Sequence, residues 1–246
     1  MKKLLGSIAL SLLFVFSFSA QAGPGTHING IAVDNPADGM KIVEAFNTWM
    51  EGAGKKSKNR ILLLQNVADG GNPATHSFVS IHPSMAANEA FNQSIGDDEA
   101  KLAEWFKFLE VVVPVSRITS TTRTAHIKAW GDVNNDDKVW LVHSMTATDG
   151  RSVYRALDAW MSSDTAKKFP GQMHLFAGVA GSQVSHTIAL GYESEAEMEK
   201  WGDMSRGSAD LAHLLSSLQS VTEYHGASLS REVAAWGADL EDVLKR

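Results

Sequence analysis

Histidine is the residue type in this sequence that could most readily carry out chemistry. There are nine histidines, and none of them stands at a spacing typical of a metal pair. Four fall one on each predicted strand of the second half of the chain: His143, His174, His186 and His225. Imidazole exchanges protons near neutral pH, so such a cluster on one sheet face is a candidate catalytic centre. The structural alternative is that each ring only satisfies the backbone near it.

A second group of residues is predicted to contact a ligand. His76 and His186 begin matching strands in the two halves, and Tyr192 follows His186 by six residues on the same strand face. Trp140 has no aromatic counterpart in the first half and could form the floor of a pocket. The candidate ligand-binding residues are therefore His76, His82, His186, Tyr192 and Trp140.

Other site chemistries are excluded by what the sequence lacks. It contains no cysteine, so disulfides, thiolate nucleophiles, cysteine-bound zinc and covalently attached c-type haem are impossible. It has no phosphate-binding glycine loop, no Gly-x-Ser-x-Gly and no His-Glu-x-x-His. The acidic run 132–137 lacks the glycine and the final glutamate of a calcium-binding loop. We predict no metal site.

Composition and charge narrow the range of partners. The chain has 246 residues, of which 44% are hydrophobic and 20% charged, with a net charge of -6. This composition is that of a globular protein. An acidic chain without a stripe of basic residues is a poor nucleic-acid binder, so no nucleic-acid partner is expected. Arg117 and Arg123 share one face of a predicted strand and could meet an anionic ligand, although two such arginines more often face solvent.

The N-terminus has the three parts of a secretory signal peptide. Lys2 and Lys3 precede a short apolar run, which ends at a small-residue site, Ala20-Gln21-Ala22. We expect cleavage after Ala22, which makes residues 1–22 a signal peptide and the mature protein periplasmic or secreted. A membrane anchor is the alternative, but the apolar run is short for a span of about 20 residues. After cleavage no membrane partner is expected.

The remaining sequence contains an internal duplication. Asp38-Gly39 matches Asp149-Gly150, and Trp49-Met50 matches Trp160-Met161, all at an offset of 111. His76 matches His186 at 110, and both halves end with Ala-Trp-Gly, at 129–131 and 235–237. By this alignment His143 and Tyr192 correspond to Ala32 and His82. A turn-forming run at 131–137 separates the copies, so we predict two repeats, 23–132 and 133–246.

Each repeat shows the same order of elements. The apolar periodicities predict strands at 28–33, 61–67, 76–82 and 115–127, a helix from Asp38, and a long helix over 85–112 broken near Gly96. The second half gives strands at 139–145, 174–179, 184–192 and 222–229, with helices at 150–162 and 195–218. This βαββαβ order is the ferredoxin-like plan, with strand order 4-1-3-2 and both helices on one sheet face.

This duplicated pattern resembles the dimeric α+β-barrel superfamily, here fused in one chain; no subfamily is identified. The predicted fold is α+β: two ferredoxin-like βαββαβ repeats packed sheet to sheet as a pseudo-dimeric α+β barrel, because each sheet must cover its bare face. The resemblance implies three classes of function: small-molecule binders, cofactor-independent monooxygenases and haem enzymes.

We favour an exported protein that binds a small molecule between or within the two sheets. An enzyme of the monooxygenase or haem type, using histidines of the second half, is one alternative, and a structural or protein-interaction module is another. No cofactor is expected, with haem as a less favoured possibility. The fused pair could also associate as a homo-oligomer.

Overall fold

The computed structural model describes residues 23–68 and 73–245. The predicted signal peptide, residues 1–22, and most of the turn before His76 lie outside the described residues. Within the described ranges, no helix combines the length and the hydropathy that a membrane crossing requires.

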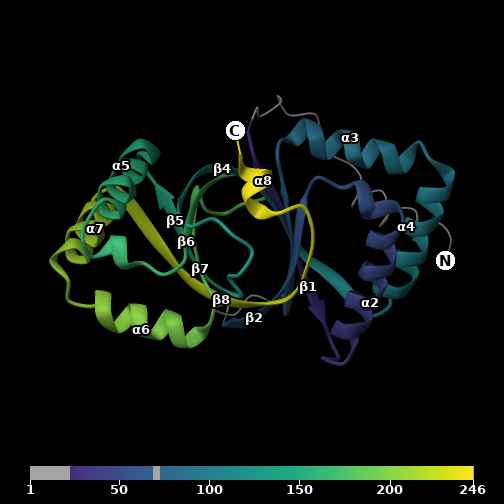
Figure 1. Ribbon diagram of the computed structural model, residues 1–246, viewed down its shortest axis with the longest axis horizontal. Helices are drawn as coiled ribbons and strands as arrows, with labels where there is room; N and C mark the ends of the chain where they lie inside the picture. The colour runs from purple at the N-terminus through teal and green to yellow at the C-terminus, as the bar shows by residue number, and fades with distance from the viewer. Residues whose placement is uncertain (1–22, 69–72, 246) are drawn as a thin grey trace.

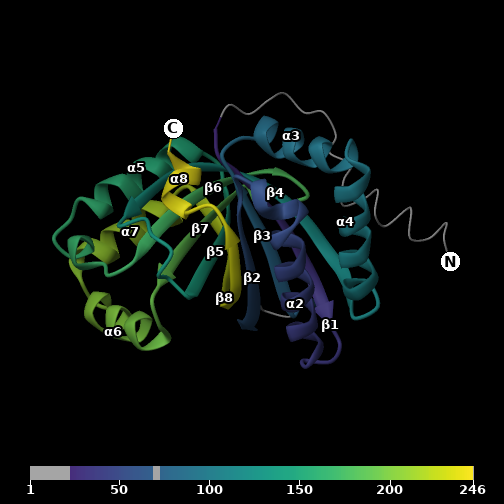
Figure 2. The ribbon, with the colours of Figure 1, turned by 45° about the vertical axis from the view of Figure 1, so that its right-hand side comes forward.

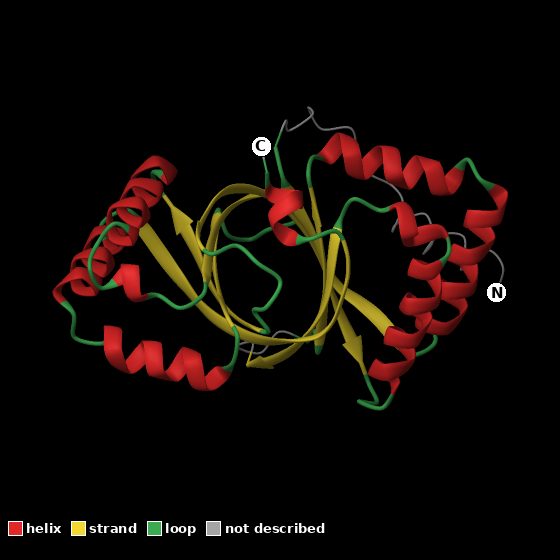
Figure 3. Cartoon of the chain, in the orientation of Figure 1, coloured by secondary structure: helices red, strands yellow, loops and turns green. Residues whose placement is uncertain are grey.

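Eight antiparallel strands close into one barrel, which occupies the centre of the molecule (Figure 3). The ring order is β1-β3-β2-β8-β5-β7-β6-β4. The strand bounds are β1 (Gly25–Val33), β2 (Arg60–Ala68), β3 (His76–His82), β4 (Ser116–Gly131), β5 (Val139–Ala147), β6 (Gln172–Ala180), β7 (His186–Tyr192) and β8 (Thr222–Gly237). Each half contributes four consecutive strands in the order 4-1-3-2, as the ferredoxin-like plan predicts.

The last strand of each half is longer than predicted. β4 and β8 each have 16 residues, and both run on through the Ala-Trp-Gly sequence that we expected beyond their ends. The extra length pairs with the other half: the end of β4 pairs with β6, and the end of β8 pairs with β2. Two β-strands therefore join the halves, and the sheet has no free edge at either junction.

Helices cover the outside of the barrel at two opposite ends (Figure 1). α2 (Asp38–Glu51), α3 (Met85–Gly96) and α4 (Glu99–Val112) lie over the first half. α5 (Gly150–Met161), α6 (Glu195–Ser205) and α7 (Ala209–Gln219) lie over the second half, and the turned view separates the two groups again (Figure 2). Two short 3₁₀ turns, η1 (Ala53–Lys56) and η2 (Ala166–Lys168), follow α2 and α5.

Helix ends follow local capping signals. The predicted break at Gly96 is confirmed, because the Asp98 carboxylate accepts hydrogen bonds from the amides of Ala100 and Lys101 and starts a new helix. The single helix predicted over 195–218 is wrong. Gly207 has a positive φ of 83°, and the Ser208 hydroxyl caps α7 by accepting a hydrogen bond from the Leu211 amide.

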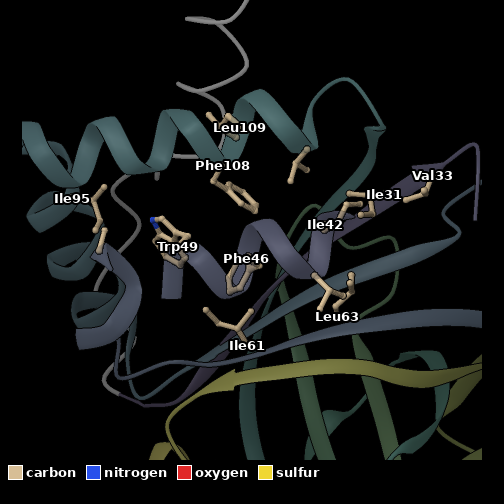
Figure 4. Close-up of a cluster of buried hydrophobic side chains, with 13 residues drawn as sticks. Ile31, Val33, Ile42, Phe46, Trp49, Ile61, Leu63, Ile95, Phe108 and Leu109 are labelled. Atoms are coloured by element: carbon tan, nitrogen blue, oxygen red, sulfur yellow. The ribbon is translucent and has the colours of Figure 1, made fainter. Parts of the chain in front are cut away.

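Three apolar cores result from this arrangement. Two lie between the sheet and the helices, one in each half; Figure 4 shows the first-half core, in which Phe46 and Trp49 of α2 face Phe108 of α4. The third fills the barrel interior. A C-terminal helix that the sequence analysis missed, α8 (Leu240–Leu244), contributes Leu240 and Val243 to this third core.

Candidate functional site

The first half contains a cavity of about 610 Å³ between the sheet and its covering helices. Its floor comes from β1, β2, β3 and β4, and its walls come from α2, α3 and α4. Arg117, Ile118 and Thr121 of β4 are exposed and mark its open side. The cavity is thus outside the barrel, whereas the sequence analysis expected a pocket between or within the two sheets.

Aromatic side chains from both the helices and the sheet line the cavity. Six of them line it: Phe46, Trp49, Phe78, Phe91, Trp105 and Phe108. The rings of Trp105 and Phe108 stack with their centroids 4.9 Å apart, and Trp49 meets Trp105 edge-on at 5.3 Å. Such interlocked rings give a rigid apolar surface on which a flat ligand can stack.

Among the titratable residues that line this cavity, His27 on β1 is the best placed to interact with a ligand. Its Nε2 atom is fully buried and has no hydrogen-bond partner among the described residues. Burial, and secondly the positive charge of Arg123 directly opposite on β4, lower the pKa of His27 to about 4. The ring is therefore neutral at pH 7, and it offers either a lone pair or an N–H to a ligand, depending on its tautomer.

Side-chain amides and hydroxyls complete the polar part of the lining. The Asn59 amide donates to the Asn88 carbonyl oxygen at 2.9 Å and to the Ser80 hydroxyl at 3.3 Å. On the open side, the Thr121 hydroxyl donates to the Asn29 side-chain oxygen at 2.9 Å. A few fixed polar groups in an apolar cavity are the usual means by which a pocket orients a small molecule.

The duplication shows that three polar residues in or beside the cavity are not required by the fold. Strand register aligns the halves position by position, because Gly25 pairs with His82 as Val139 pairs with Tyr192. Three polar residues of the first half then correspond to leucines of the second: His27 to Leu141, Ser80 to Leu190, and Arg123 to Leu229. Those leucines pack against the second-half core. At these three positions the first half carries polar side chains where the second half packs leucines.

The matched pair His76 and His186 makes matched structural contacts. Nδ1 of His76 is 2.9 Å from the Thr75 hydroxyl, and Nδ1 of His186 is 2.9 Å from the Ser185 hydroxyl. Each hydroxyl also accepts a hydrogen bond from the last residue of the neighbouring strand. Neither histidine lines the first-half cavity.

His82 lies beside the cavity. It is fully buried next to His27, and neither ring nitrogen makes a well-formed hydrogen bond to a described residue. Burial, then His27 and Arg123, lower the pKa of His82 to about 4, while the nearby Ser84 backbone opposes the shift. The matching residue, Tyr192, is packed edge-on against Phe169 in the second-half core, and burial raises its pKa.

The four histidines of the second half do not come together. His174 points into the barrel, where its Nδ1 is 3.3 Å from His126 Nε2 and its Nε2 is 2.8 Å from the Gln172 side-chain oxygen. The Gln172 oxygen can only accept, so His174 Nε2 carries the proton and its Nδ1 accepts from His126. Burial and His126 lower the pKa of His174 to about 3. Trp140 packs beside it, with the ring centroids 6.0 Å apart.

His143 and His186 share the opposite, helix-facing side of the sheet with different partners. Nδ1 of His143 is 3.1 Å from the Tyr224 hydroxyl. His225 is exposed, and its Nε2 is 2.8 Å from the Thr146 hydroxyl. The register also corrects one correspondence: His143 matches Asn29, not Ala32, because the connection after β1 is three residues longer than the one after β5.

The sequence analysis missed His27 and the amide residues of the cavity. Two of the cavity residues carried a usable signal. His27 and Ser80 correspond to leucines when β1 is aligned with β5 at an offset of 114 and β3 with β7 at an offset of 110. That alignment requires the strand pairing, which the sequence alone does not show.

Comparison with known proteins identifies the fold. No protein-family model and no curated protein matches the sequence. Among solved structures, a candidate monooxygenase from Fusobacterium nucleatum is similar over 89% of this chain and 98% of its own, with a TM-score of 0.58 and 10% identity. An anthrone oxidase-like protein covers 89% of this chain and 94% of its own, with a TM-score of 0.56 and 14% identity.

A third similar structure corrects one expectation. A heme-binding protein from Thermus thermophilus covers 87% of this chain and 93% of its own, with a TM-score of 0.51 and 9% identity. The expectation of no cofactor was wrong as an inference from the fold, because the same fold occurs in a protein that binds haem. The strand order, the duplication and these similarities together show that the chain has the fold of the dimeric α+β-barrel superfamily, with both halves of the barrel in one chain.

Proposed function

We propose that the protein binds a flat, largely apolar small molecule with oxygen substituents in the first-half cavity. The observation that carries this proposal is the cavity itself: it measures about 610 Å³, six aromatic rings wall it, and His27, whose buried Nε2 has no hydrogen-bond partner among the described residues, lines it. Ligand pockets typically measure about 300–1,000 Å³ and combine apolar walls with a few polar groups. This cavity has both properties.

The chemistry of His27 favours binding over proton abstraction. A phenol has a pKa of about 10, so transferring its proton to an imidazole with a pKa of about 4 is uphill by about six orders of magnitude. In the unliganded protein, the neutral ring of His27 is thus a hydrogen-bonding partner for a hydroxyl group and not a strong base. The Asn88 side chain, held by Asn59, offers a second fixed polar contact.

The similar structures suggest a probe for this cavity. One of them is an anthrone oxidase-like protein, and a hydroxylated anthrone is flat, aromatic and oxygen-substituted. We therefore propose 1,8-dihydroxyanthrone as the first test ligand. Trp49 and Trp105 line the cavity, so binding would quench their fluorescence.

The test compares the wild-type mature protein, residues 23–246, with two single variants. Ser80→Leu places in the cavity the residue that the second half carries at the same position, so the variant is compatible with the fold. We expect it to weaken binding at least about tenfold by filling the space. Ser216→Leu makes the same change on an exposed position of α7 and should bind normally. Equal binding by all three proteins, or no binding by any, would contradict the proposal.

Haem is a second candidate ligand, supported by the neutral imidazole of His27. Iron needs an axial nitrogen with a free lone pair, and His27 is the histidine that lines the cavity, with an Nε2 that has no hydrogen-bond partner among the described residues. His27 would hold the iron and the aromatic walls would contact the porphyrin, which would supply redox chemistry when bound. The test is a haemin titration: a Soret shift lost in His27→Leu but kept in His143→Asn supports this candidate, and a shift kept in both variants contradicts it.

We also propose that the protein is exported by the segment 1–22. Mass spectrometry of the purified native protein should give a chain beginning at Gly23. A mature chain that retains the apolar run would contradict export by cleavage.

A further inference from the structure

Asn88 on α3 has a side-chain amide whose orientation is fixed by its neighbours. The Asn59 side-chain nitrogen donates to the Asn88 side-chain oxygen at 2.9 Å and to the Ser80 hydroxyl at 3.3 Å. The oxygen of the Asn88 amide therefore faces Asn59. Its Nδ2 group, on the other branch of the planar amide, points away from Asn59 and carries two N–H donors.

The Nδ2 group of Asn88 is available to a ligand. It makes no hydrogen bond to another described residue and, unlike Nε2 of His27, it is not completely buried. Asn88 lines the first-half cavity and is only 6% exposed, so the cavity is where these N–H groups can meet a partner. Buried donors in proteins are normally satisfied, so a molecule in the cavity is expected to present an oxygen acceptor here.

The second half shows that the fold does not require this pair of amides. α3 and α6 each begin directly after a capping serine, and this aligns Asn88 with Met198. Met198 packs against the second-half core. Strand register aligns Asn59 with Gly171, which has no side chain. Both amides therefore belong only to the half that contains the cavity.

No charged side chain is positioned to neutralise an ion in this cavity. The described lining residues include no aspartate, glutamate or lysine, and His27 is neutral at pH 7. Arg117 borders the cavity, but its strand neighbours Ser116 and Ile118 take the helix-facing positions, so its own side chain lies on the other face of the sheet. Burying an ion without a partner of opposite charge is strongly unfavourable, so the cavity favours an uncharged group.

A carbonyl oxygen satisfies both requirements. It accepts a hydrogen bond without a charge, and it carries no proton that needs a further acceptor, whereas the Asn88 oxygen is already used by Asn59. We propose that the polar group which the ligand buries beside Asn88 is an uncharged carbonyl oxygen, which accepts a hydrogen bond from the Asn88 Nδ2 group. This inference rests on the proposed binding function and names the chemical group that the cavity selects.

The experiment uses three probes that share the fluorene ring system and differ at carbon 9. Fluorene has no polar group there, 9-fluorenone has a carbonyl oxygen, and 9-fluorenecarboxylate has an anion. Equilibrium dialysis against the mature protein, read by absorbance at pH 8, gives the Kd of each probe. We expect the wild-type protein to bind the carboxylate at least about tenfold more weakly than 9-fluorenone.

Two variants test the role of Asn88. Asn88→Met installs the residue of the second half, and the ratio of the fluorene Kd to the 9-fluorenone Kd should fall about tenfold, because the hydrogen bond that distinguishes these probes is lost. Asn88→Asp keeps the oxygen that faces Asn59 but replaces the N–H donors with a second oxygen, so the same ratio should fall at least as far. Gln93→Met and Gln93→Glu make the matched changes at an exposed position of α3 and should leave the ratio unchanged.

The outcomes separate this inference from the proposed function. If the ratio is the same in the wild type and in both Asn88 variants, the assignment to Asn88 is overturned while the cavity still binds flat molecules. If the carboxylate binds as tightly as 9-fluorenone, the requirement for an uncharged group is overturned. If 1,8-dihydroxyanthrone binds but 9-fluorenone does not, the carbonyl group is not what the cavity recognises. If none of these compounds binds the wild-type protein, the proposed function itself fails.

Discussion

Trp236 at the end of β8 donates its indole N–H to the side-chain oxygen of Asn47 on α2, at 2.6 Å. The donor belongs to the second half of the chain and the acceptor to the first, 189 residues away. The equivalent contact is present in the other repeat: Trp130 at the end of β4 donates its indole N–H to the side-chain oxygen of Asp158 on α5, at 3.0 Å. The repeated Trp and Asn/Asp residues thus form hydrogen bonds that link the last strand of each half to the first helix of the other half, α2 or α5.

Removing these contacts should destabilise the whole barrel. Trp236→Phe and Trp130→Phe keep most of the ring but lose the N–H, so we expect each to lower the free energy of unfolding by about 1 kcal/mol. Urea unfolding followed by circular dichroism measures this. Both variants should unfold in a single transition, and two separate transitions would show that the halves are independent.

His27→Leu should stabilise the protein while weakening ligand binding. A buried nitrogen without a partner costs about 1–3 kcal/mol, and the matching position of the second half already holds Leu141. We therefore expect the free energy of unfolding to rise by about 1 kcal/mol. The reverse change, Leu141→His, should lower it by about 2 kcal/mol or more, because it places a polar ring in a packed core. A loss of stability in His27→Leu would mean that His27 has a structural role.

Acid should destabilise the fold through its buried histidines. His27 and His82 have pKa values of about 4, and His174 about 3, against 6.5 for the unfolded chain. The unfolded state therefore binds more protons below pH 6.5. The stability contributed by these neutral rings is complete above about pH 6.5 and is lost as the pH falls toward about 4 and then about 3.

The measurement is urea unfolding at several pH values between about 7 and about 4.5, where each of the three histidines should contribute a slope of about 1 kcal/mol per pH unit in the lower part of the range. His82→Tyr, which installs the residue of the matching position, should show a shallower dependence than the wild type. An unchanged slope would mean that the His82 ring can be protonated in the folded state.

The C-terminal helix α8 should act as a structural plug of the barrel. Leu240 is buried in the interior core, and the Leu240 amide donates to the Asn135 side-chain oxygen at 3.0 Å. Leu240→Ala should lower the free energy of unfolding by about 3 kcal/mol. Leu244→Ala, at a partly exposed position of the same helix, is the control and should cost less. Equal effects would indicate that the helix does not pack into the barrel.

Sequence patterns predicted the elements well because their signals are local. The repeated Asp-Gly helix starts, the alternation in β3 and the break at Gly96 each depend on a few neighbouring residues. The extension of β4 through Trp130 and the helix α8 escaped prediction, because both are stabilised by residues of distant segments.

The site was harder to predict than the fold, since it depends on which face each strand residue occupies. His174 and His143 are both strand histidines, yet one points into the barrel and the other toward the helices. Shifts in register after Gly30 and Ser144 further change which residues oppose each other. The cavity beside His27 arises from the packing of three helices, and no sequence motif records it.

The joining of both halves in one chain has a consequence for how this barrel can change. In a barrel made of two identical chains, every substitution appears twice, so a cavity that lowers stability would form in both copies. Here His27 of the first half corresponds to Leu141 of the second, and Arg123 corresponds to Leu229. In the fused chain a substitution occurs in one half only. One half can therefore acquire a binding cavity while the other keeps the apolar packing that stabilises the barrel.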